Sequence, residues 1–167
     1  SCSYKANCGA QGVNISLGWV YQFMGNAIGS AVLPIAWSIT WKDCSAAGAK
    51  GKLSSMDFTG STLGQPTSIA AKGTVSEDVV SGSKYTLKLS AMGVSLLTHT
   101  DDLCNDTTVS LPMSLGTIKM SGLGCTHKAG DFAVTETLTL SQHVLFPKAS
   151  VQLTTNDPDG NEYFCAE

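Results

Sequence analysis

The sequence has few charged residues and no cluster of basic ones. Charged side chains make up 14% of the 167 residues, against roughly 25% in an average soluble domain, and serine and threonine take their place. No lysine- or arginine-rich block offsets the formal net charge of −3, which argues against binding nucleic acid and against electrostatic attachment to anionic membranes. This composition is typical of an extracellular β-protein, and the length fits one domain.

The sequence also lacks the motifs of nucleophilic and metal-dependent enzymes. His99, His127 and His143 lie on three separate segments, and none belongs to an H-x-x-x-H or H-x-x-E pattern. A G-x-S-x-G motif is missing as well. We therefore predict that the protein is not an enzyme and needs no metal or cofactor.

Two acidic stretches have simpler structural explanations. Asp101 and Asp102 are adjacent, so on a strand their side chains would point to opposite sides. We favour a solvated loop over a pair of catalytic carboxylates. The stretch from Asp157 to Glu162 is too short for a calcium loop and lacks the distal bidentate carboxylate. Its turn-forming residues predict a hairpin instead.

No stretch of the sequence is long and apolar enough to predict a membrane-spanning helix. Residues 27–37 are apolar, but they are too few to cross a bilayer, and no basic segment precedes them as it would in a signal peptide. We expect that the numbering starts at the mature end, after removal of a signal peptide, and that the protein is soluble and secreted or lumenal.

The cysteine content points to disulfides. There are six cysteines and no C-x-x-C pair, which indicates an oxidising compartment rather than a metal or redox site. Six cysteines allow fifteen pairings, and the spacing alone does not choose among them. Asn14-Ile-Ser16 and Asn105-Asp-Thr107 are N-glycosylation sequons that fit the same compartment.

Alternating side chains predict three strands near the C-terminus. From Phe132 to Leu140 the even positions are apolar except for Glu136, whereas the odd positions are mostly threonine. This period of two indicates a strand with one wet face. A second alternation covers residues 149–155, and a third strand is predicted at residues 163–165 after the turn at 156–161.

Glu136 interrupts the apolar face of the first of these strands. A buried, unpaired carboxylate would cost several kcal/mol. Three explanations are open: a position at the mouth of a cavity, pairing with a lysine, or a strand register different from the one assumed. A role in binding a polar group of a ligand is a further hypothesis.

Earlier segments predict further strands. Odd positions are apolar over residues 33–41, and strands are also predicted at 53–59, 69–80 and 84–91. We expect the last two to form a hairpin around Ser81-Gly82-Ser83. The apolar positions change register at Ala91-Met92-Gly93, which indicates a bulge or the end of a strand.

The first 38 residues fit two patterns. Residues 13–23 alternate as a strand does, yet a set of apolar side chains between Val13 and Ala31 also recurs at helical spacing. We favour strand, turn and strand, because Gly18, Gly25 and Gly29 would each cost a helix about 1 kcal/mol. Trp19 and Phe23 make this extension too apolar for an idle tail. We predict that it covers the body of the protein or forms a membrane-docking or self-association surface.

The order of several motifs resembles a known family. Trp41-Lys-Asp43-Cys44 comes first, and Gly73-Thr-Val75 is then followed by Val80-Ser-Gly82-Ser-Lys84-Tyr85. Cys125 is closely followed by Lys128-Ala-Gly-Asp-Phe132, and an Asp-x-Gly turn precedes the terminal Phe164-Cys165. Together these stretches resemble the ML (lipid-recognition) domain family, particularly its ganglioside-activator-like branch, over residues 39–167.

This resemblance implies an all-β fold with an internal cup. Members of the family are two-sheet antiparallel β-sandwiches, immunoglobulin-like in architecture, whose sheets splay apart to take lipid between them. The resemblance implies disulfides Cys44–Cys165 and Cys104–Cys125, which leaves Cys2 to pair with Cys8. Residues 1–38 would then be an N-terminal extension, a hairpin or an amphipathic segment, and residues 39–167 the lipid-binding sandwich.

The weakly periodic stretch from Thr98 to Leu123 fits this cup. We expect it to be an irregular wall or lip of the cavity, because its methionines suit shapeless apolar ligands. The other candidate lining residues come from the apolar faces of the predicted strands and from the register change. They are Met56, Phe58, Leu87, Leu89, Met92, Leu96, Phe132, Val134, Leu138, Leu140, Val151 and Leu153.

The resemblance implies a secreted or lysosomal protein that binds or transfers lipid without catalysis, holding an acyl chain, a glycolipid or a sterol between its sheets. Its partners would be the lipid or glycolipid, transiently a membrane surface, and a protein such as a receptor or a hydrolase. The alternative is a secreted interaction or adhesion module, a receptor ligand or toxin subunit, with a filled core. Periodicity alone does not separate a filled core from a cavity.

Overall fold

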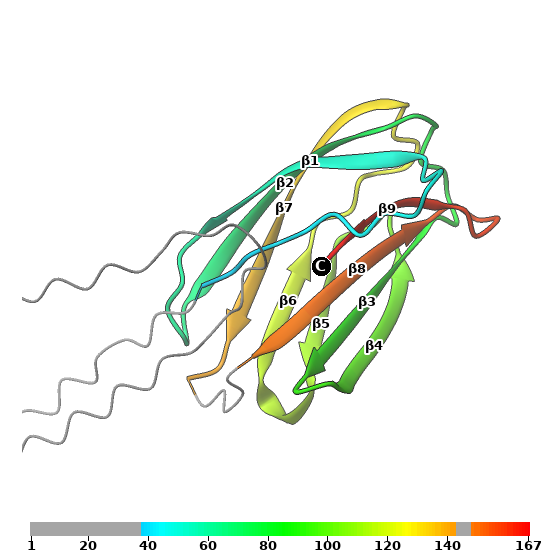
Figure 1. Ribbon diagram of the computed structural model, residues 1–167. Coiled ribbons are helices and arrows are strands. Elements are labelled where there is room, and N and C mark those ends of the chain that lie inside the picture. The colour runs from blue at the N-terminus through cyan, green and yellow to red at the C-terminus, as the bar shows by residue number, and fades with distance from the viewer. Residues whose placement is uncertain (1–37, 143–147) are drawn as a thin grey trace, which may run out of the picture.

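The protein is an all-β sandwich of two antiparallel sheets (Figure 1), as the sequence predicts. The computed structural model describes residues 38–142 and 148–167. One sheet has five strands in the order β1 (Gly51–Thr59), β2 (Pro66–Val75), β7 (Gly130–Leu140), β6 (Gly116–Met120) and β5 (Thr107–Leu111). The other has four, in the order β4 (Val94–Asp102), β3 (Lys84–Ala91), β8 (Ala149–Asn156) and β9 (Glu162–Ala166).

Alternation of side chains explains how the sheets face one another. In β3, Tyr85, Leu87 and Leu89 are buried, whereas Thr86 and Lys88 lie on the other face of the strand. Burying an apolar side chain of this size stabilises the fold by about 1.5–3 kcal/mol. The same alternation in β7 places Phe132 and Leu138 inside. The core therefore lies between the two sheets.

The predicted hairpin between residues 69–80 and 84–91 is wrong. Strand β2 ends at Val75 and pairs with β1 and β7, whereas β3 pairs with β4 and β8 in the other sheet. The chain crosses between the sheets in between, and Val79 forms an isolated bridge with His127. Alternation shows which side chains of a strand face inward, but it does not specify the neighbouring strand.

The predicted irregular wall at residues 98–123 is also wrong in its local structure. Strand β4 continues to Asp102, and β5 and β6 form a hairpin around the 3-10 helix η1 (Pro112–Ser114). The periodicity was weak because both strands have only five residues. Ile118 and Met120 of β6 nevertheless face the interior.

Only part of the predicted strand at 33–41 lies within the described residues. Residues 38–41 are not in a strand, although Lys42 exchanges backbone hydrogen bonds with Glu167 (2.7 and 3.0 Å) and Asp43 bridges to Ala166. The boundary near residue 38 stays a prediction. The two alternatives for the extension, the pairing of Cys2 with Cys8, and Asn14 fall outside the described residues.

Both remaining disulfides implied by the family resemblance are present. Cys44–Cys165 ties the segment before β1 to β9, across 121 residues of sequence. Cys104–Cys125 joins the loop after β4 to the loop before β7, across 21 residues.

One end of the sandwich is closed by packed and paired side chains. The Phe132 and Phe164 rings stack with centroids 5.1 Å apart across the two sheets. Phe132 fits because it lies over Gly73, where an added Cβ would be only 2.7 Å from its ring. At the same end Lys50 contacts Asp157 of the β8–β9 turn at 2.8 Å and Glu77 at 2.6 Å. Hydrogen bonding to Lys50 holds the pKa of Asp157 below its ordinary value. We call this region the closed end.

Candidate functional site

An apolar cavity of about 520 Å³ lies between the two sheets. This volume falls within the range of about 300–1,000 Å³ that is common for small-molecule sites. Both sheets contribute its walls. The lining residues from the strands are Met56 and Phe58 (β1), Ile69 (β2), Leu87 (β3), Ile118 and Met120 (β6), Glu136 and Leu138 (β7), Ala149, Ser150, Val151 and Leu153 (β8), and Ala166 (β9).

The cavity extends to residues that are exposed in the described part of the chain. Ser38, Thr40 and Lys42, before β1, line it together with Lys148 and Ala149 at the start of β8. Lys42 forms an ion pair with Glu167 at 3.0 Å. We call these residues the rim. The cavity thus runs from the rim toward the interior.

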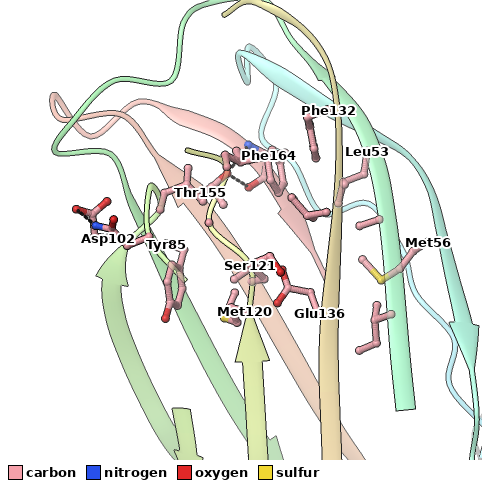
Figure 2. Close-up of a pocket in the computed structure, with 18 residues that line it drawn as sticks. Leu53, Met56, Tyr85, Asp102, Met120, Ser121, Phe132, Glu136, Thr155 and Phe164 are labelled. Atoms are coloured by element: carbon pink, nitrogen blue, oxygen red, sulfur yellow. Dashed lines mark hydrogen bonds between the residues drawn. The ribbon is translucent and has the colours of Figure 1, made fainter. Parts of the chain in front are cut away.

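A smaller cavity of about 50 Å³ lies toward the closed end (Figure 2). Phe132, Phe164 and Tyr85 are among its lining residues. Side chains that line both cavities mark the junction between them, which we call the collar. The collar consists of Met56, Ile69, Met120, Glu136 and Leu153.

The structure brings most of the candidate lining residues together. Six line the larger cavity: Met56, Phe58, Leu87, Leu138, Val151 and Leu153. Phe132 and Val134 line the smaller one. The strand faces chosen from the sequence therefore enclose the space between the sheets.

Four candidates line neither cavity. Leu89 is buried in the core, and Leu96 and Leu140 pack against it. Met92 lies in the turn between β3 and β4, where its backbone φ is 53° and the residue is 74% exposed. The register change at this point marks the turn, so the inward face does not continue through it.

Some lining residues were missed because their segments were misread. Ile118 and Met120 alternate in β6, but this strand fell within the stretch expected to be irregular. Ile69 alternates with Ala71 in β2, and this alternation would have revealed it. Ile39 and Trp41 also line the cavity, and both belong to the apolar odd positions of residues 33–41, although residues 38–41 are not in a strand.

Glu136 lies in the wall of both cavities with its carboxyl group turned inward (Figure 2). The register is as assumed, because Glu136 pairs with Ile69 on the same inner face. Backbone N–H of Ser121 donates to the carboxyl group, but Oε2 is buried and has no hydrogen-bond partner. In the described part of the chain no lysine forms an ion pair with it.

Burial dominates the protonation of this group. The pKa of Glu136 is raised to about 8, mainly by burial; the Ser121 amide opposes the rise, and the negative charge of Asp106 adds to it. At neutral pH the side chain is therefore mostly an uncharged carboxylic acid, with one O–H donor and a carbonyl acceptor. A wall group of this kind can hydrogen-bond a neutral polar ligand.

The two histidines within the described residues, His99 and His127, line neither cavity. His99 faces Asp101 at 3.6 Å, and His127 bridges to Val79. His143 is outside the described residues. Within residues 38–142 and 148–167, no three histidine, cysteine, aspartate or glutamate side chains are grouped to hold a metal ion. The same residues contain no helix that could span a membrane.

Two sheets that enclose an apolar, ligand-sized cavity define the class: a β-sandwich with an internal binding cup. The chain belongs to the ML-domain family, whose model matches residues 38–167, and this is a family of lipid-recognition domains.

Two individual proteins are also similar to this chain, one in fold and one over a short stretch of sequence. The fold is similar to that of a Niemann-Pick type C2 protein from the Japanese carpenter ant, with a TM-score of 0.53, 12% identity, and coverage of 77% of this chain and 95% of that one. A 37-residue stretch, 22% of the chain, is 51% identical to part of the urea-proton symporter DUR3 of Oryza sativa subsp. japonica. The chain spans only 5% of that symporter.

Proposed function

We propose that the protein binds a lipid between its two sheets and carries it without chemical change. The observation that supports this function is the apolar cavity of about 520 Å³, whose walls come from both sheets. An acyl chain, a sterol or the hydrophobic part of a glycolipid suits such a space. Transfer to or from a membrane surface, and delivery to a receptor or hydrolase, would complete the role.

The free energy of burying a hydrocarbon chain is large enough for stable binding. A chain of about 16 carbons gains roughly 0.8 kcal/mol for each CH₂ that leaves water, on the order of 10 kcal/mol in total. Immobilising the lipid costs a few kcal/mol of this. The remainder corresponds to micromolar or tighter binding. We therefore expect the purified protein to carry a lipid from its source.

The disulfides and one sequon support an oxidising compartment. Cys44–Cys165 and Cys104–Cys125 are formed, and Asn105 is exposed in the loop after β4. Disulfides are rare in reducing compartments. We propose that the protein is secreted or lies in the lysosomal lumen, and that Asn105 is a glycosylation site.

The proposal predicts that filling the cavity will exclude the ligand. Leu138→Trp adds volume to the wall of the larger cavity. In an open cavity the added ring should displace lipid with little loss of stability, whereas in a filled core it would cost about 1–3 kcal/mol. Displacement of a fluorescent fatty acid, measured beside thermal unfolding, separates the two cases.

Val94→Trp is the matched control, because Val94 is 61% exposed on β4. It should change neither binding nor unfolding. Native mass spectrometry of the parent protein should show a lipid that leaves on denaturation. If the parent protein binds no lipid and Leu138→Trp is destabilised, the core is filled, and an interaction module becomes the better function.

A further inference from the structure

The collar places one polar group inside an otherwise apolar cavity. Four of its five members are Met56, Ile69, Met120 and Leu153, and the fifth is Glu136. Oε2 of Glu136 is buried without a partner. Leaving a polar atom unsatisfied in the interior typically costs about 1–3 kcal/mol. A ligand that supplies a hydrogen-bonding group at this point removes that cost.

The space on each side of the collar decides how a lipid lies. Toward the rim there is room of about 520 Å³ for hydrocarbon, whereas only about 50 Å³ remains toward the closed end. The smaller cavity has space for a few atoms, such as a terminal hydroxyl group. A polar group that reaches Glu136 must therefore be at or near one end of the ligand, with the tail directed toward the rim.

A second buried polar atom belongs to a residue that lines the smaller cavity. The Tyr85 side chain lines the smaller cavity, and its buried hydroxyl has no hydrogen-bond partner of good geometry. Thr107 lies close to this hydroxyl, but its own hydroxyl donates to Asp101 at 3.0 Å. The carboxyl group of Glu136 thus lies at the inner end of the larger cavity (Figure 2). The strand residues between the collar and the rim are mostly apolar.

Charged head groups do not suit this inner end. In the described chain the lysines that line the cavity, Lys42 and Lys148, are both at the exposed rim. A phosphate or a carboxylate at the collar would have no counter-ion among the described residues, and desolvating it would be costly. A lipid with an ionised head would instead leave its head at the rim beside Lys148.

We propose that the cavity takes lipids head first, with a small uncharged hydroxyl group hydrogen-bonded to the carboxyl group of Glu136 and the hydrocarbon extending toward the rim. The inference rests on the proposed lipid-binding function and names its ligand class, neutral single-hydroxyl lipids such as long-chain alcohols or sterols. Glu136 acts here as the residue that determines specificity.

The test compares two chain-matched ligands in two backgrounds. Dodecan-1-ol and dodecane are each used to displace a fluorescent fatty acid from the full chain at pH 6. The ratio of their dissociation constants is then calculated. In Glu136→Leu the alcohol loses its partner and the alkane does not. We expect this ratio, alcohol over alkane, to rise about tenfold over the parent protein.

Two further variants separate hydrogen bonding from packing. Glu136→Gln keeps a neutral donor and acceptor at the same place, so its ratio should stay near that of the parent protein. Asp131→Leu removes an exposed carboxylate from the same strand and should leave the ratio unchanged. Glu136→Met offers a second apolar side chain if Glu136→Leu does not fold, as judged by thermal unfolding.

The outcomes distinguish this inference from the function on which it rests. Absence of probe binding in the parent protein overturns both. If the parent protein binds the probe and the alkane, but the alcohol-to-alkane ratio of dissociation constants is the same in the parent and Glu136→Leu proteins, only the head-first arrangement is overturned. Displacement by dodecan-1-ol that weakens in Lys148→Ala as much as displacement by dodecyl phosphate does also overturns it, because the hydroxyl group would then lie at the rim.

Discussion

Glu136 holds its proton at a higher pH in the folded protein than in the unfolded chain. Burial raises its pKa from 4.5 to about 8. Other titratable side chains near it are Asp102, Asp106 and Tyr85 on the closed side, and Lys42, Lys148 and Glu167 at the rim. Only Asp106 is a charged group that contributes to the shift. The raised pKa of this one side chain therefore makes the stability of the fold depend on pH.

The sign of this dependence follows from which state binds the proton. Between pH 4.5 and about 8 the unfolded chain has lost it and the folded protein still holds it, so this contribution to stability is complete below pH 4.5 and declines as pH rises toward 8. We expect the free energy of unfolding of the lipid-free protein to fall by a few kcal/mol over this interval. Urea unfolding at pH 5 and pH 8 measures it. In Glu136→Gln the decline should disappear, and a decline of equal size in both proteins would contradict the assignment.

The alternation in the sequence assigned some residues to the inward face correctly and others wrongly. The alternation around Phe132 and Leu138 identified an inward face, and Glu136 stood out because it broke that alternation. Met92 was assigned inward by the same rule and lies in an exposed turn. Periodicity reports which face a side chain shares with its neighbours in sequence, and this information ends where the strand ends.

The bounds of the strands were predicted better than their pairing in the sheets. Strand β3 has the bounds expected from its alternation, Lys84–Ala91, and β7 and β8 differ from expectation by only a few residues. Pairing in the sheet depends on residues far apart in the chain, such as Ile69 of β2 and Glu136 of β7. Local composition does not encode such contacts, so the β2–β3 hairpin was wrong and the β5–β6 hairpin was missed.

The two disulfides join elements over very different lengths of chain, which predicts unequal contributions to stability. In the chain-entropy model, losing Cys44–Cys165, with a separation of 121 residues, costs about 4–5 kcal/mol, and losing Cys104–Cys125, with a separation of 21, costs about 3 kcal/mol. Double alanine variants of each pair, compared by urea unfolding with the parent protein, measure both. A larger loss for Cys104–Cys125 would show that the β5–β6 hairpin depends on its disulfide for packing as well.

At the scale of the whole molecule, the family resemblance supplied what periodicity did not. The sequence pattern predicts a two-sheet sandwich, but an immunoglobulin-like filled core would show the same alternation. The motif order from Trp41 to Cys165 added the cup and the two disulfides. How far the sheets separate depends on the sum of many side-chain contacts, and only the structure provides it.

The closed end determines the order of events in ligand exchange. Stacked rings and the Lys50 cluster join the sheets there, so among the described residues a bound lipid and an incoming one share the passage at the rim. One molecule has to leave before the next can enter. We expect the rate at which a bound fluorescent lipid is released to stay constant as the competitor concentration rises, in a stopped-flow measurement. A rate that increases with competitor would mean that the sheets part elsewhere and that two lipids occupy the cup at once.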